Sequence, residues 1–237
     1  MSEWWAYQPS DLLMFSPQTY YRLFELYNTG LWPAQILTLA AGVAIATLMV
    51  RGPRWRGRVI SSLLALMWFF VAWGYFIDCY ATINLAAPYF ALGFVVQAML
   101  LAVVGSIRGH ITFDAVKTPT EKVGIALFLF ALVFQPLIGP LVGREWSGVE
   151  LFGVAPDPTV VGTLGVFLAA DRIRWELFII PVVWCAVTGA TLWIMKSPEA
   201  FLMPLVGLLA LILAAHKSLK RDHGHAVGAN KDRLTVR

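Results

Sequence analysis

The sequence is poor in charge, in cysteine and in the signatures of soluble enzymes. Only 14% of its 237 residues are charged and 59% are hydrophobic, whereas a soluble domain carries about a quarter charged residues. This balance excludes an ordinary soluble domain and indicates a protein of the lipid bilayer. The two cysteines, Cys79 and Cys185, are too few for a disulfide framework or a metal cage.

Several classes of enzyme and cofactor-binding protein lose support because their characteristic residues or motifs are missing. No histidine falls inside a hydrophobic run and no lysine lies at the centre of one, which argues against membrane haem and a retinal Schiff base. There is no Walker loop, HExxH or GxSxG. His216, His223 and His225 lack accompanying ligands and are more typical of a solvated tail than of a metal site. We therefore expect no enzymatic activity, no cofactor and no metal.

Long apolar runs predict an all-α, polytopic membrane helix bundle, because a helix satisfies its own backbone groups in lipid. Seven runs are hydrophobic enough to contribute: 31–50, 59–77, 85–107, 123–141, 158–170, 175–195 and 198–215. The bundle is expected over residues 31–215, between an aromatic-rich segment at 1–30 and a basic, largely disordered tail at 216–237.

The first 30 residues predict an interfacial helix, since aromatic rings favour the headgroup level. Ser16 is positioned to cap it and Pro17 suits its first turn. The aromatic residues of this segment are Trp4, Trp5, Tyr7, Phe15, Tyr20, Tyr21, Phe24 and Tyr27.

The fifth apolar run is short. Asp157 and Pro158 form a helix start, with the carboxylate as the expected cap, and the run ends before Asp171. Its length is roughly 20 Å at 1.5 Å per residue, against a hydrocarbon core of ~30 Å. It is therefore either a short crossing, which gives seven transmembrane helices, or a re-entrant helix beside six. For a crossing, we expect it to be surrounded by protein, with residues 155–158 bordering a polar cavity.

Basic residues favour the seven-helix alternative. They collect on the cytoplasmic side of membrane segments, and crossing by the fifth run places all the strongly basic loops and the tail on that side. These residues are Arg51, Arg54, Arg56, Arg58, Arg172, Arg174, Lys217, Lys220 and Arg221. The net charge of +4 thus indicates membrane orientation, with the N-terminus outside and the C-terminus cytoplasmic, and no nucleic-acid partner.

Polar residues inside or beside membrane helices are functional candidates. Asp78, Tyr80 and Asn84 fall in one short loop, DCYATIN, that we expect to face outward. This loop is either the mouth of a solute pathway or an interfacial turn whose polar groups cap helix ends.

A second polar centre is expected where Pro136 removes a backbone hydrogen bond and kinks the fourth run. Gln135, Gln97 and Thr188 are candidates to meet there, as in the broken helices of transporters. Alternatively, the two glutamines only join helices to one another.

Three segments, EWWAYQPSDLLMFSPQTYYRLFELYN, YATINLAAPYFAL and FGVAPDPTVVGTLG, resemble a family of small bacterial inner-membrane proteins catalogued as a domain of unknown function. The resemblance implies the bacterial inner membrane as location. It implies no activity and supplies no site residues.

The leading functional hypothesis is a transporter or channel-like protein for a small solute or ion. Its pathway residues are Asp78, Asn84, Gln97 and Gln135, supported by Tyr80, Pro136, Asp157 and Thr188. The alternative is a non-catalytic accessory subunit of a larger respiratory, photosynthetic or transport complex. The expected partners are the lipid bilayer and other membrane subunits or a second copy of the chain.

Overall fold

A computed structural model describes residues 15–114, 116 and 118–235, with side chains as far as residue 220. These residues form helices and no strands, as the sequence predicts. Five helices within them are long and apolar enough to span a membrane: Arg56–Thr82, Ala87–Ile107, Pro119–Leu141, Trp175–Ile194 and Leu202–Lys220. The N-terminal residues Trp4, Trp5 and Tyr7 of the expected interfacial segment lie outside the described part.

The helices follow the hydrophobic runs closely. Their bounds are α1 Pro17–Leu31, α2 Ala34–Val50, α3 Arg56–Phe70, α4 Ala87–Leu100, α5 Pro119–Leu129, α6 Gln135–Leu141, α7 Pro156–Ala169, α8 Trp175–Ile194 and α9 Leu202–Thr235. Three π-helical segments continue α3, α4 and α5: η3 Val71–Ile77, η5 Leu101–Ile107 and η6 Phe130–Phe134. Two short 3₁₀ turns, η4 Tyr80–Thr82 and η7 Trp146–Gly148, lie in loops.

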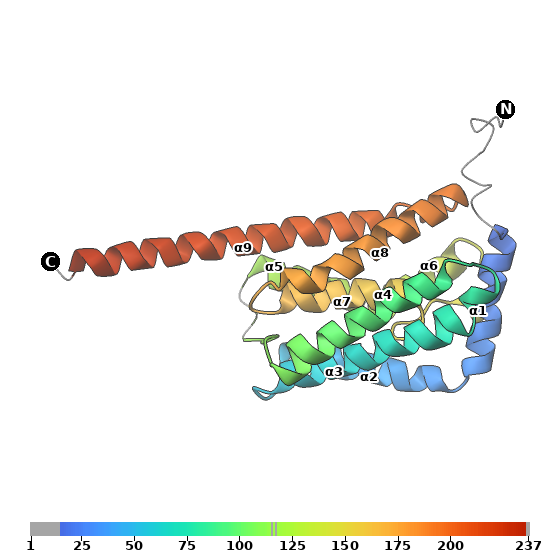
Figure 1. The fold of residues 1–237 in the computed structure, drawn as a ribbon, viewed down its shortest axis with the longest axis horizontal. Helices are drawn as coiled ribbons and strands as arrows, with labels where there is room; N and C mark the ends of the chain where they lie inside the picture. Colours follow the sequence, from blue (N-terminus) through green and yellow to red (C-terminus); the bar gives the residue numbers. More distant parts are fainter. Residues whose placement is uncertain (1–14, 115, 117, 236–237) are drawn as a thin grey trace, which may run out of the picture.

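Helix α1 lies across one end of the bundle, at 92° to α2 (Figure 1). Ser16 caps it by accepting a hydrogen bond from the Thr19 amide at 3.2 Å, and Pro17 opens its first turn, as the sequence predicts. Its aromatic face is buried against the bundle: the Phe24 ring stacks on Tyr75 of η3, with 5.1 Å between centroids. A position at the membrane interface stays a prediction.

Helix α7 forms the centre of the bundle. All 14 of its residues are buried, which confirms that protein surrounds it. It packs closely on α5 through glycines, since a Cβ added at Gly165 would lie 2.7 Å from the carbonyl oxygen of Gly124. Only glycine permits this approach of the two backbones.

The two ends of α7 lie at opposite ends of the bundle (Figure 1). At its C-terminal end the Lys217 ammonium of α9 donates to the Ala170 carbonyl at 2.6 Å and the Leu168 carbonyl at 3.2 Å. Asp171 follows, and its amide donates to the carbonyl of Thr112 in the loop before α5. Arg56 Nη2 also donates a hydrogen bond at this end of the bundle, to the Phe113 carbonyl oxygen at 2.7 Å. Helix α7 therefore runs along the bundle between its ends and does not fold back.

Two further features lie in the fourth hydrophobic run and at the C-terminal end. The fourth run is interrupted before Pro136 by the π-helical segment η6, in which the Gln135 amide bonds to the Phe130 carbonyl five residues earlier. The π-helical turn ends at Phe134, shortly before Pro136, which has no backbone N–H to donate. Helix α9 continues to Thr235 and extends beyond the bundle (Figure 1).

Candidate functional site

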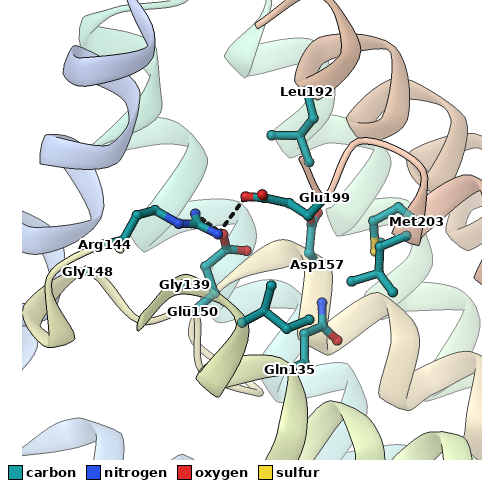
Figure 2. A pocket seen from close by; sticks show the side chains of 11 residues that line it. Gln135, Gly139, Arg144, Gly148, Glu150, Asp157, Leu192, Glu199 and Met203 are labelled. Carbon is teal, nitrogen blue, oxygen red and sulfur yellow. Dashed lines mark hydrogen bonds and ion pairs between the residues drawn. The ribbon is translucent and has the colours of Figure 1, made fainter. Parts of the chain in front are cut away.

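A small polar cavity lies at the end of the bundle where α7 begins. Its volume is about 30 Å³, enough for one or two water molecules. The loop between α6 and α7, the start of α7 and the connection between α8 and α9 form its walls (Figure 2). Its charged residues, Arg144, Glu150, Asp157 and Glu199, are called the carboxylate cluster below.

Arg144 holds the cluster together. Its Nη2 donates to Glu199 Oε1 at 2.5 Å, and its Nη1 lies 3.7 Å from Glu150 Oε1 (Figure 2). The guanidinium carbon also lies 4.5 Å from the ring centroid of Tyr21 on α1. All three charged side chains are largely buried, so the guanidinium compensates carboxylates that water reaches poorly.

Asp157 enters the cluster from the first turn of α7, with a 6% exposed side chain. Its Oδ1 accepts hydrogen bonds from Trp184 Nε1 at 2.8 Å and Thr188 Oγ1 at 3.0 Å, both on α8. The predicted capping role is wrong, because α7 begins at Pro156 and makes no side-chain cap bond. The carboxylate lies inside the bundle instead, where α8 supplies two donors.

The cluster carries three carboxyl groups against one guanidinium. Full ionisation would leave two uncompensated negative charges in a buried space, which is strongly unfavourable. The pKa of the Glu150 carboxyl is accordingly raised to about 8, chiefly by burial and next by the Asp157 carboxylate, while Arg144 opposes the rise. Burial and the neighbouring carboxylate therefore favour the protonated form of Glu150.

Unused hydrogen-bonding groups surround the same space. Gln135 lines the cavity and is 6% exposed, yet its Oε1 has no protein partner within the described residues. Glu199 Oε2 and Arg144 Nε are also buried without one. Buried polar groups normally find a partner, so the cavity suits water or an exchanging proton.

A wider hollow lies on the other side of Arg144. Its volume is about 680 Å³ and its walls include Arg22, Glu25 and Glu145. Arg144 and Gly148 line both spaces. The Tyr21 hydroxyl, 2.7 Å from Ser197 Oγ, joins α1 to the connection before α9 beside this point. Arg144 thus borders both the hollow and the 30 Å³ cavity, while Tyr21 lines the hollow.

The cluster is not arranged as a metal site. Within the described residues, no three histidine, cysteine, aspartate or glutamate side chains are grouped so that they could hold a metal ion.

A family of unknown function, DUF6064, matches residues 17–224. The chain belongs to this family. No curated protein and no solved structure matches the chain significantly. The resemblance to a family of unknown function is thereby confirmed, and the matched region contains all four residues of the carboxylate cluster.

The structure brings together three of the residues that the sequence singles out. Gln135 and Asp157 line the cavity, and Thr188 bonds to Asp157. Pro136 is buried next to Gln135.

The other predicted pathway residues lie outside the cavity lining. Asp78 is exposed after η3. Asn84 Oδ1 accepts from the Ala86 amide at 2.9 Å before α4, and Tyr80 is buried beside it. Gln97 is fully buried and donates to the Leu177 carbonyl at 3.1 Å. Their functional roles stay predictions.

Sequence reasoning did not identify Arg144, Glu150 and Glu199 as candidate site residues. One signal was available for Glu199: it falls inside the predicted membrane run 198–215, and an acid in such a run is a functional candidate. Arg144 and Glu150 carry no comparable signal, because only the folded loop turns them toward the bundle.

Proposed function

We propose that this protein is a channel-like transporter that carries protons across the bacterial inner membrane through the carboxylate cluster. The observation behind the proposal is that three carboxyl groups share one buried cavity with a single guanidinium. Ionisable groups inside a membrane protein are costly and mark ion or proton pathways.

A membrane setting is supported by the five helices of sufficient length and hydropathy. We infer two further crossings, α2 and α7. Helix α2 has only 17 residues but is strongly apolar, and α7 runs from one end of the bundle to the other. The loops at the Lys217 end carry the clustered arginines, so this end is assigned to the cytoplasm and the carboxylate cluster to the outer side.

The size of the cavity supports a proton over a larger solute. About 30 Å³ admits one or two waters and excludes a sugar, an amino acid or a hydrated cation. In this proposal a proton passes from the outer hollow to Glu150 or Glu199 beside Arg144 and from there by water to Asp157, and its release at the cytoplasmic end is the step that the flux assay below measures. Thr188 and Trp184 stabilise the ionised form of Asp157 by donating hydrogen bonds to it.

The test is proton flux into liposomes that contain the purified protein and a pH-sensitive dye, with an imposed potassium diffusion potential. Asp157→Asn should lower the flux by about a hundredfold, the lower end of what a positioned proton-transfer group contributes. Asp78→Asn is the matched control, because Asp78 is exposed and outside the cavity, and it should leave the flux unchanged.

Wild-type flux in a folded Asp157→Asn variant would refute the proposal. Loss of flux in Asp78→Asn alone would favour the DCYATIN loop as the pathway instead. No flux in the wild-type protein, together with stoichiometric co-purification of a larger membrane complex, would support the accessory-subunit alternative.

A further inference from the structure

A second hollow, unrelated to the carboxylate cluster, lies at the bend between α1 and α2. Its volume is about 470 Å³, and none of its lining residues borders the 30 Å³ cavity. Residues from the end of α1, the start of α2 and the loop after η7 form its walls, and no charged side chain is among them. We call this space the elbow groove.

Gln35 is the main polar side chain of the elbow groove. It is 6% exposed, and its Nε2 donates to the backbone carbonyl of Asn28 at 2.6 Å. This bond fixes the orientation of the amide, because the reverse orientation would set two acceptors against each other. Gln35 Oε1 is buried and has no protein partner within the described residues. Gln35 therefore places an unpaired acceptor in the wall of the groove, where a donor that reaches it would remove the cost of leaving it unpaired.

The end of α1 adds negative potential to the same place. Helix α1 ends at Leu31 with no basic residue in its last turn, so the partial negative charge of its terminal carbonyls is not compensated by its own side chains. Asn28 Nδ2 fastens this turn to the loop by donating to the Ser147 and Val149 carbonyls, both at 2.8 Å. Charge complementarity thus favours a cationic donor in the elbow groove.

The part of the groove that follows Gln35 along α2 is apolar. Ile36 and Leu39 of α2 and Leu151 of the loop line it. Leu39 lies about 6 Å further along α2 than Gln35, at 1.5 Å per residue. Trp32 and Trp146, 70% and 68% exposed, flank the groove, as aromatic rings do at the headgroup level. The groove wall thus changes from polar at Gln35 to apolar at Leu39, in the same order as the headgroup and acyl chain of a membrane lipid.

We propose that the elbow groove binds a phospholipid with a primary ammonium headgroup, such as phosphatidylethanolamine. The ammonium donates to Gln35 Oε1 and faces the C-terminal end of α1, and an acyl chain runs along α2 over Leu39. A primary ammonium has three N–H donors, whereas the trimethylated ammonium of phosphatidylcholine has the same charge and none. This pair of lipids separates donor recognition from general binding to an apolar surface.

The experiment measures thermal unfolding of the full-length protein in mild detergent with either lipid added, with identical acyl chains. Phosphatidylethanolamine should raise the unfolding midpoint by about 3–5 °C more than phosphatidylcholine, which corresponds to roughly tenfold tighter binding. Gln35→Leu should abolish this difference while the response to phosphatidylcholine remains. Leu205→Ala, at an exposed position of α9, is the control and should preserve the difference.

Equal shifts with the two lipids, or a difference that survives in Gln35→Leu, would overturn the proposal. If Gln35→Leu does not yield folded protein, Leu39→Trp serves as the second test of lipid binding in the elbow groove. The larger side chain fills the apolar part of the groove without touching the Gln35 bond to Asn28, and bound phosphatidylethanolamine should then be lost in native mass spectrometry. Retention of the lipid at wild-type stoichiometry would refute the assignment.

Discussion

Replacement of Arg144 by methionine tests the electrostatic account of the carboxylate cluster. The substitution removes the hydrogen bond to Glu199 Oε1 and the nearby charge from Glu150, and leaves both carboxyl groups largely buried. Removing one partner of a buried ion pair costs about 3–5 kcal/mol. In a chain of this length each kcal/mol corresponds to about 2–4 °C in the unfolding midpoint. We therefore expect the midpoint to fall by roughly 6–20 °C at pH 8.

The fall in the unfolding midpoint of Arg144→Met should be larger at alkaline than at acidic pH. The pKa of Glu150 is raised on folding, so its contribution to stability is fully present below its ordinary value of 4.5 and is lost as the pH rises through about 8. Arg144 opposes that rise, so in its absence the pKa moves higher and the cost at alkaline pH grows. The difference between Arg144→Met and wild type should accordingly be smaller at pH 5 than at pH 8.

Thermal unfolding in detergent at the two pH values measures this difference. Arg22→Met is the matched control, because Arg22 is 67% exposed and pairs with Glu25 at the surface. Surface pairs contribute about 0–1 kcal/mol, so this variant should change little at either pH. The same midpoint loss for Arg144→Met at pH 5 and pH 8, or a loss no larger than that of Arg22→Met, would refute the reasoning.

Two further predictions concern α7. Lys217→Met should lower the free energy of unfolding by about 3 kcal/mol, because it removes a largely buried ammonium from Glu121 and from the α7 carbonyls. Lys220→Met, one turn further along α9 and exposed, should cost less than about 0.5 kcal/mol, and equal effects in a thermal melt would contradict the assigned role of Lys217. Gly165→Ala should lower the free energy of unfolding by about 1–3 kcal/mol, because the added Cβ forces α5 and α7 apart. Gly93→Ala is the control: an added Cβ there meets nothing within 4 Å, so this variant should be neutral or stabilising. A neutral Gly165→Ala would show that the two backbones can separate freely.

Much of the helical fold could be predicted because long apolar runs in a sequence indicate membrane helices. The run at 158–170 is α7 to within two residues at its start, and its enclosure by protein followed from its shortness. The cap at Ser16 and the proline after it also followed from local rules. The π-helical segments did not, because each depends on how a helix packs against its neighbours and no residue pattern marks it.

The candidate site was predictable only in part. Asp157, Gln135 and Thr188 stood out because polar residues are rare in apolar runs, and they do gather at one end of the bundle. Arg144 and Glu199 are 55 residues apart in the sequence and meet only because the loop before α7 and the connection before α9 lie side by side. Local sequence rules say which polar residues are unusual, but not which loops will face each other.

The shortness of α7 and the position of the carboxylate cluster have a common cause. Fourteen residues cover about 21 Å at 1.5 Å per residue, which is less than a bilayer core of ~30 Å. At the C-terminal end Lys217 satisfies the last carbonyls, and a cation there also complements the helix dipole. At the N-terminal end the chain enters as an irregular loop, which brings Glu150 close to Asp157 and leaves the cavity open above the helix. Further turns of apolar helix at this end would fill that space. A helix long enough to cross the whole bilayer core would therefore remove the cavity that Glu150, Asp157, Glu199 and Arg144 share.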